Sequence, residues 1–274
     1  MTRLFVFGLG YAARAIAAAA GGAVMATTRD GRDGTIRFDD EAAVRAAVAA
    51  ATHVLSSVPP EGDADPVLAR YSDVLPGKWL GYLSSTGVYG DTGGAWVDEG
   101  APADRGRRAN RNAADAAWRG LGARVFRLPG IYGPGRSALE RVAAGTAQRT
   151  GVAGQVFSRV HVADIAAGVV AGFAAPPGVY NLADDEPAPQ DDVLAFAAQL
   201  LGLPAPPVVP LDALSPAARA FHLENRRVAN GRARRVLGWR PLYPDYRAGL
   251  RALSATTSPM PASTPPATAS GDQR

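Results

Sequence analysis

Short apolar runs alternate with longer alanine-rich stretches along the chain up to about residue 134. The apolar runs have the length of strands and lack alternating polar positions, which is typical of strands covered on both faces. We expect these strands at 3–8, 23–28, 53–58, 79–85 and 124–128. Helical stretches lie between them, at 12–20, 40–50, 65–75 and 108–120. The alternation predicts an α/β fold of the Rossmann type, which is a doubly wound parallel sheet with helices on both faces.

The pattern changes beyond residue 134. Further elements are expected there: helices at 137–148, 164–174 and 190–201, a strand at 179–182, and basic helical segments up to 253. We therefore expect a nucleotide-binding domain over 1–175, with some lobe segments inserted after 134, and a smaller substrate-binding lobe over 176–253. Residues 254–274 are Ser, Thr, Pro and Ala with almost no apolar bulk, which predicts a disordered tail.

The first strand runs into the sequence Gly8-Leu9-Gly10-Tyr11-Ala12-Ala13 and then a helix. In a G-x-G-x-x-A turn, the first glycine allows a tight turn and the second lets the backbone approach a pyrophosphate. The small third residue, here Ala13, lets the helix pack closely on the strand, and the helix N-terminus offers N–H donors to the anion. The alternative is a glycine turn that only connects strand and helix. On the first strand of a β-α-β unit, the pattern favours dinucleotide binding.

The end of the second strand indicates which dinucleotide is preferred. An acidic residue about 20 positions after the first glycine binds a ribose 2′-hydroxyl, whereas an arginine accommodates a 2′-phosphate. Arg29 lies 21 residues after Gly8, with Arg32 close behind and no acid before Arg29 on that strand. This predicts NADP, with NAD possible; an exposed loop arginine is the alternative. Asp39 is either an adenine contact or a solvated residue at a helix start.

Five further segments carry a resemblance to a known family: Ser84-Ser85-Thr86-Gly87-Val88-Tyr89-Gly90, Arg127 with Leu128-Pro129-Gly130-Ile131-Tyr132-Gly133-Pro134-Gly135, Val160-His161-Val162-Ala163-Asp164, Tyr180-Asn181-Leu182, and Leu237-Gly238-Trp239-Arg240-Pro241. Together they resemble the extended short-chain dehydrogenase/reductases, the group of NAD-dependent epimerases and dehydratases. The resemblance covers roughly residues 3–253, and the combination of motifs is far more specific than any one of them.

The resemblance implies a serine that hydrogen-bonds the reacting oxygen, and Ser85 matches it, with Thr86 beside it. It also implies a catalytic Tyr-x-x-x-Lys pair, which is missing, because Lys78 is the only lysine and precedes the serine segment. Alignment through Asp115 places Arg107 at the tyrosine position and Arg111 at the lysine position, in an atypical form of the family. An arginine can hold ribose hydroxyls, but it does not exchange protons near neutral pH.

Other side chains are candidates for the missing role. Tyr89 and Tyr132 lie in segments expected near nicotinamide and substrate, although packing is the more common role of such tyrosines. A basic wall for a substrate diphosphate is also possible. It would comprise Arg136, Arg141, Arg159, Arg226 and Arg227, and solvent-facing arginines are the alternative. The acidic run 184–186 fits solvated loops or helix caps, and His161 fits a structural role.

Composition excludes several classes. The charge of +4 raises nucleic acid as a partner, but it is spread along the chain and not interleaved with aromatic residues, so no nucleic-acid partner is expected. The chain has no cysteine and its three histidines lack metal-ligand spacing, so no metal is expected. No apolar stretch reaches a membrane span. We expect a cytoplasmic protein that acts on a small-molecule substrate, with a homodimer left open.

These observations predict an NADP-preferring oxidoreductase of the atypical kind, acting on a hydroxyl or carbonyl of a small or nucleotide-linked substrate. The rival hypothesis is a catalytically silent NADP(H)-binding sensor or scaffold, which the arginines at positions 107 and 111 favour.

Overall fold

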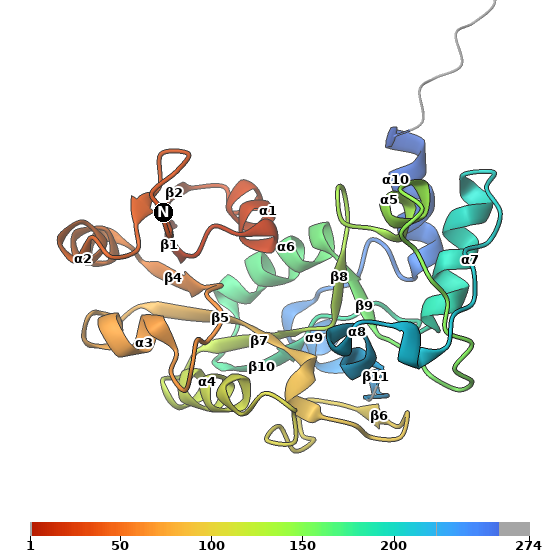
Figure 1. Cartoon of the computed structure of the whole chain (residues 1–274). Coiled ribbons are helices and arrows are strands. Elements are labelled where there is room, and N and C mark those ends of the chain that lie inside the picture. The colour runs from red at the N-terminus through yellow and green to blue at the C-terminus, as the bar shows by residue number, and fades with distance from the viewer. Residues whose placement is uncertain (1, 223, 258–274) are drawn as a thin grey trace, which may run out of the picture.

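Seven parallel strands form the central sheet of the computed structural model, which describes residues 2–222 and 224–257 (Figure 1). Their order across the sheet is β10-β7-β5-β4-β1-β2-β3. The strands are β1 (Arg3–Phe7), β2 (Ala23–Thr28), β3 (Ile36–Arg37), β4 (His53–Ser56), β5 (Trp79–Ser85), β7 (Arg124–Leu128) and β10 (Gly178–Asn181). The prediction of a doubly wound parallel sheet is confirmed.

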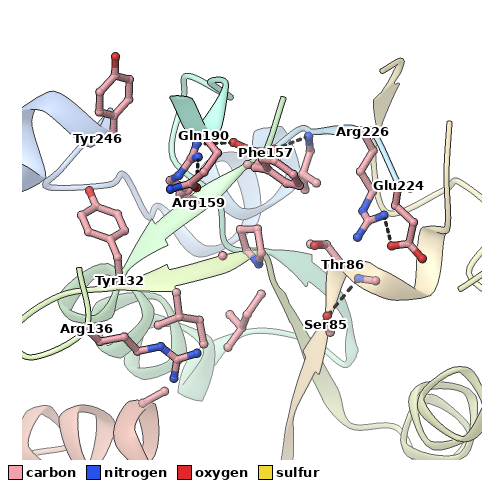
Figure 2. A pocket seen from close by; sticks show the side chains of 18 of the residues that line it. Ser85, Thr86, Tyr132, Arg136, Phe157, Arg159, Gln190, Glu224, Arg226 and Tyr246 are labelled. Carbon is pink, nitrogen blue, oxygen red and sulfur yellow. Dashed lines mark hydrogen bonds and ion pairs between the residues drawn. The ribbon is translucent and has the colours of Figure 1, made fainter. Parts of the chain in front are cut away.

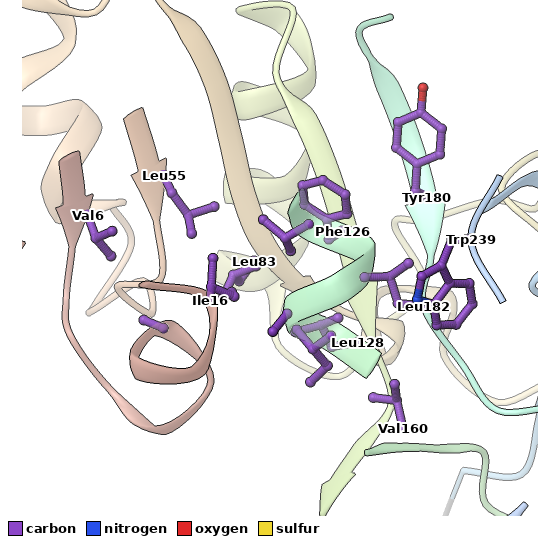
Figure 3. Packing of buried hydrophobic residues seen from close by; sticks show 14 of the residues in the cluster. Val6, Ile16, Leu55, Leu83, Phe126, Leu128, Val160, Tyr180, Leu182 and Trp239 are labelled. Atoms are coloured by element: carbon purple, nitrogen blue, oxygen red, sulfur yellow. The ribbon is translucent and has the colours of Figure 1, made fainter. Parts of the chain in front are cut away.

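Helices cover both faces of this sheet, which explains why its strands lack alternating polar positions. On one face α1 (Tyr11–Ala19) packs on α6 (Val162–Ala171), over a core that includes Ile16 and Leu128 (Figure 3). On the other face lie α2 (Glu41–Ala50), α3 (Pro66–Tyr71) and α4 (Ala109–Gly120), over a second core cluster. The chain crosses from one side of β1 to the other between β3 and β4, so a crevice opens at the carboxyl ends of β1 and β4.

Local sequence determines where several helices begin. The Asp40 side chain accepts a hydrogen bond from the Ala43 amide at the start of α2, and Asp65 precedes Pro66 at the start of α3. Ser137 and Glu140 form a capping box at the start of α5 (Ala138–Ala143). The described residues also form four short 3₁₀ segments: η1 (Ser72–Val74), η2 (Thr86–Tyr89), η3 (Gly172–Ala174) and η4 (Leu211–Ala213).

The smaller lobe is built on α5, α7 (Gln190–Leu200) and α10 (Tyr246–Thr257), which share one apolar cluster. Two small parallel sheets join it to the large sheet. In one, β8 (Gly130–Tyr132) pairs with β9 (Arg159–His161); in the other, β6 (Trp96–Val97) pairs with β11 (Arg227–Val228). The remaining helices are α8 (Pro216–Phe221) and α9 (Gly231–Leu237).

Several predicted boundaries are wrong. Strand β10 lies within the residues predicted for the lobe, and it pairs with β7 at the edge of the central sheet. Helix α5 ends at Ala143, because Gly145 turns the chain at φ 66°. Helix α10 continues to Thr257, four residues into the predicted tail, because Leu253 packs in the lobe cluster. Residues 258–274 lie outside the described residues. None of the described helices is long and apolar enough to cross a membrane.

Candidate functional site

The turn after β1 lies at the crevice between β1 and β4. Gly8 adopts φ 81°, and a Cβ there would lie 2.9 Å from a methyl group of Val58. The Thr27 hydroxyl accepts a hydrogen bond from the Gly8 amide at 3.0 Å, and the Ser57 hydroxyl donates to the Gly8 carbonyl at 2.8 Å. Strand β2 and the residue after β4 therefore hold the turn from both sides, in a conformation that glycine adopts without strain.

The N-terminus of α1 opens toward solvent at this turn. Gly10 is the N-cap, and no side chain caps the helix, so its first N–H groups lack intrahelical partners. A Cβ on Gly10 would meet nothing within 4 Å, and Ala12 lines a large cleft. Ala13 is fully buried against the sheet, as the third small residue of the motif should be. The crevice is open, so these residues fit a pyrophosphate at the helix terminus.

Tyr11 connects this helix to the segment after β8. Its hydroxyl donates to the Pro134 carbonyl at 3.0 Å, and a Cβ on Gly133 would approach the same hydroxyl to 2.6 Å. The Arg136 guanidinium lies 5.7 Å from the centre of the Tyr11 ring. Arg136 is thereby placed beside the N-terminus of α1 as well as on the cleft wall.

The cleft has a volume of about 910 Å³ and extends from Ala12 into the space between the central sheet and the smaller lobe. It brings together residues predicted from separate motifs. Figure 2 shows Ser85 and Thr86 on one side and Tyr132 and Arg136 on the other. The predicted site residues that line it are Ala12, Ser85, Thr86, Arg107, Arg111, Tyr132, Arg136, Arg141, Arg159 and Arg226, whereas Arg227 is not part of the lining.

Ser85 ends β5 and caps the short segment η2. Its Oγ accepts a hydrogen bond from the Gly87 amide at 3.0 Å, which leaves the hydroxyl hydrogen available to another acceptor. Thr86 is buried at the same turn. The geometry allows Ser85 to donate a hydrogen bond to an oxygen atom in the cleft.

Arg107 and Arg111 both line the cleft, but only Arg111 lies within helix α4. Helix α4 begins at Ala109, so Arg107 precedes it while Arg111 is in its first turn. Arg107 Nε donates to Glu224 Oε1 at 2.7 Å. An Arg111 nitrogen lies 3.4 Å from the Tyr82 hydroxyl, a long contact that leaves most of its donors available.

Glu224 was not predicted, and it is the buried centre of an ion-pair group in the cleft. It is 8% exposed and accepts from both Arg107 and Arg226, each at 2.7 Å (Figure 2 shows the Arg226 pair). Burial alone would raise the pKa of Glu224, but hydrogen bonds from the two arginines hold that pKa below its usual value. Arg107 lies far from Glu224 in the sequence, so the sequence near Glu224 gave no sign of this ion-pair group except the neighbouring Arg226.

A second buried polar group lies beneath the cleft floor. Arg127 on β7 forms a two-point ion pair with Asp115 on α4, at 3.0 and 2.7 Å, and Ser84 donates to the same carboxylate at 2.7 Å. Arg127 also donates to the Tyr89 hydroxyl, which in turn donates to Asn181 at 2.8 Å. Tyr89 is therefore buried in the scaffold. Contrary to the prediction, it does not line the cleft.

Tyr132 and Arg159 line the cleft but have little freedom. The Tyr132 hydroxyl lies 3.5 Å from the Asp245 carbonyl, and burial together with the Asp184, Asp164 and Asp245 carboxylates raises the pKa of Tyr132 well above its usual value. Arg159 donates to two backbone carbonyls and to Gln190, and burial lowers its pKa to about 10.

Asp184, in the run interpreted as solvated, is 1% exposed, so that interpretation is wrong for this residue. Burial raises the pKa of the Asp184 carboxyl group well above its usual value.

Three predicted cofactor residues lie at the surface away from the cleft lining. Arg29 is 91% exposed and 3.2 Å from Glu61. Arg32 lies 3.6 Å from Asp30, and Asp39 pairs with Arg37 through two hydrogen bonds. Their exposure leaves them accessible to a ligand bound across β2, but each already has an ionic partner.

No protein-family model matches the sequence. A functionally unknown conserved protein from Silicibacter pomeroyi DSS is 42% identical, with a TM-score of 0.81, over 93% of this chain and 99% of that chain. The chain belongs to the family of this Silicibacter protein. The human epimerase family protein SDR39U1, solved with NADPH, has a TM-score of 0.71 at 19% identity, covering 93% of this chain and 99% of the human one. This chain therefore has the fold of the epimerase/dehydratase group that its motifs resemble.

A curated relative is the 3-diazoavenalumate denitrifying reductase of a Streptomyces species. It is 37% identical over 139 residues, which are 46% of this chain and 45% of that protein. The match thus spans less than half the length of this relative.

Proposed function

We propose that this chain is an oxidoreductase that binds a nicotinamide dinucleotide at the N-terminus of α1. The observation that carries this proposal is the continuity of the site: the uncapped helix start at Gly10 opens into the same cleft that contains Ser85. Such a helix start binds a pyrophosphate through its free amides. When bound, the dinucleotide would exchange hydride with a substrate.

Several of the predicted residues have a role in this proposal. The amides of Tyr11, Ala12 and Ala13 bind the pyrophosphate, and Arg111 holds a ribose hydroxyl. Arg29 binds the 2′-phosphate of NADP, the preferred dinucleotide, with NAD as the weaker alternative. Ser85 donates a hydrogen bond to the reacting oxygen, because its hydroxyl hydrogen is not used within η2.

Four residues of the described cleft lining have a carboxyl or phenol group with a shifted pKa. All four are poor proton carriers near neutral pH. Burial raises the pKa of Tyr132 and of Tyr246, while hydrogen bonds overcome burial and lower the pKa of Glu140 and of Glu224. This composition suits a substrate that needs no proton from the protein at the reacting atom. The Streptomyces relative is named as a denitrifying reductase of 3-diazoavenalumate, so diazo compounds belong among the substrates to be tested.

The first experiment measures dinucleotide binding with a minimal variant. At Gly10 the φ of −83° suits any residue and no atom lies within 4 Å of an added Cβ, so Gly10→Ala should fold normally. The methyl group would occupy the space where the pyrophosphate approaches, and we expect NADPH affinity to fall at least tenfold. Gly120→Ala, at another open position, is the matched control. Unchanged NADPH affinity in Gly10→Ala, or no affinity for NADPH or NADH in the natural sequence, would refute the proposal.

Turnover is then assayed with NADPH and a panel of small carbonyl compounds, nucleotide sugars and diazo compounds. Ser85→Ala should abolish any activity found while leaving NADPH affinity unchanged, and an unaffected rate would remove Ser85 from the mechanism. The arginines at the tyrosine and lysine positions favour a second candidate, a catalytically silent NADP(H) sensor. Tight NADPH binding without turnover on the whole panel would support that candidate.

A further inference from the structure

Arg107, Glu224 and Arg226 form a fixed ionic group in the cleft wall, hereafter the Glu224 triad. The side chains of Glu224 and Arg226 are 8% and 16% exposed, while that of Arg107 is 44% exposed. Two guanidinium groups share one carboxylate, so the triad keeps one net positive charge. Glu140, the other carboxylate in the described cleft lining, accepts bonds from the Gly135 amide and from Ser137, and the structure records no contact between it and the triad.

The triad leaves several hydrogen-bond donors unused. Arg107 contributes its Nε to Glu224, and among the described residues its two terminal nitrogens have no partner. Arg226 contributes one terminal nitrogen to both Glu224 and the Gly90 carbonyl, and its other terminal nitrogen has no partner in the described part of the chain. Since a guanidinium is always charged, these donors retain a strong affinity for an anionic acceptor.

The free edge of Arg226 lies beside Ser85. A Cβ added to Gly87 would lie 3.2 Å from Ser85 Oγ and 4.0 Å from the free terminal nitrogen of Arg226. Because Gly87 has no side chain, this space stays open, and all of these residues line the cleft. An anion bound on the triad would therefore lie next to the serine to which the proposed function assigns the reacting oxygen.

We infer that the Glu224 triad is a carboxylate-binding subsite, so that the substrate is a small organic acid whose carboxylate is held by Arg107 and Arg226. The inference rests on the proposed function for the position of the reacting group. One net positive charge matches one carboxylate better than a phosphate dianion, and planar guanidinium groups bind carboxylates through paired hydrogen bonds. Glu224 is a positioning residue that orients both arginines. The Streptomyces relative is likewise named for a carboxylate substrate.

The test measures binding of three probes of similar shape, cinnamate, cinnamamide and phenyl phosphate, by calorimetry with and without saturating NADPH. We expect cinnamate to bind and the neutral cinnamamide to bind at least tenfold more weakly. Arg107→Gln and Arg226→Gln should each weaken cinnamate binding about tenfold. Arg108→Gln is the matched control, because Arg108 lines the same cleft and carries the same charge, but the structure records no contact with Glu224.

The Glu224→Gln variant tests whether Glu224 orients Arg107 and Arg226, separately from any effect on folding. Removing the carboxylate raises the charge of the triad by one, so the ratio of phenyl phosphate to cinnamate affinity should increase severalfold, which a merely structural role for Glu224 would not produce. Circular dichroism and thermal unfolding confirm that each variant is folded.

The inference would be overturned by no cinnamate binding at millimolar concentration, by equal binding of cinnamate and cinnamamide, or by an equal loss in Arg108→Gln and Arg226→Gln. Tighter binding of phenyl phosphate than of cinnamate by the natural sequence would also overturn it. NADPH binding is measured in the same protein without probes. Cinnamate binding that depends on Arg226 but occurs without any NADPH affinity would refute the proposed function alone.

Discussion

Arg127 and Asp115 form an ion pair that is almost fully enclosed, with the two side chains 1% and 0% exposed. The pair joins β7 to α4 directly beneath the cleft, and Ser84 and Tyr89 extend it to β5 and η2. Burial lowers the pKa of Arg127, but the hydrogen bonds that Arg127 donates to Asp115 and its proximity to Tyr89 outweigh burial and raise that pKa. A buried charge whose partner is removed is strongly destabilising, which makes this pair a sensitive point of the scaffold.

Replacing Asp115 by Asn should therefore lower the free energy of unfolding by about 3–5 kcal/mol, because Arg127 would remain buried without a counter-charge. Urea unfolding measures this. Arg119→Gln is the control: Arg119 reaches the same carboxylate at 3.2 Å from a 46% exposed position, so its loss should cost less than about 1 kcal/mol. Similar losses in both variants would contradict the special role of the enclosed pair.

The Arg29–Glu61 pair makes a prediction about dinucleotide preference. Arg29→Ala should weaken NADPH binding about tenfold and leave NADH binding unchanged, because only NADPH carries the 2′-phosphate. Glu61→Gln should strengthen NADPH binding, since Arg29 loses its competing partner at 3.2 Å. Fluorescence titration with both dinucleotides measures these effects. A selective loss in Arg32→Ala and none in Arg29→Ala would transfer the role to Arg32.

The buried side chain of His161 should make the folded protein less stable in acid. Its Nδ1 accepts from the Ala163 amide at the start of α6, and burial lowers its pKa from 6.5 to about 4. The unfolded chain then binds a proton at a higher pH than the folded one, so stability falls as the pH drops from about 6.5 to about 4. The loss should reach about 3 kcal/mol.

The matched variant for this prediction is His161→Asn, which keeps an acceptor for the helix start but does not titrate. Burial also lowers the pKa of His53 and of His222, but those contributions are common to both proteins. Urea unfolding at several pH values compares the two. Parallel stability curves between pH 6.5 and pH 4 would show that His161 does not carry the effect.

Gly249 on α10 makes room for Tyr132, because a Cβ at Gly249 would overlap the tyrosine hydroxyl. Gly249→Ala should lower the free energy of unfolding by about 1–3 kcal/mol through overpacking. Adding Tyr132→Phe should restore part of that loss, since the phenol oxygen is the atom that collides. Thermal unfolding of the two single variants and the double variant checks this. Strictly additive effects would mean that the two residues do not compete for the same space.

Prediction from the sequence succeeded where a structural feature depends on nearby residues. The strand-turn-helix at Gly8–Ala13 has its glycines, its small third residue and its free helix start within one local segment. Strands β6, β8, β9 and β11, which have two or three residues each, were not predicted. So short a segment becomes a strand only by pairing with a partner that is distant in the sequence. Strand β10 was found in sequence, but its place at the edge of the large sheet depends on pairing with β7.

The same division holds for the site. Ser85, Arg107, Arg111 and Arg136 were predicted from motifs, and the fold brings them to one cleft. Tyr89 comes from an equally good motif position, but hydrogen bonds to Arg127 and Asn181 hold it in the scaffold. No pattern within either segment could distinguish these outcomes, because burial depends on the elements that pack over a side chain.

By itself the sequence determined the class of the fold and the glycine turn before α1, because periodicity, glycine positions and helix starts act over a few residues. Only the tertiary structure decided that Glu224 lies between Arg107 and Arg226, since residues 117 positions apart meet only after the lobe closes on the sheet. It likewise decided which arginines keep free donors in the cleft. The physical reason is that hydrogen-bond partners and burial are properties of packing, which no single stretch of the chain contains.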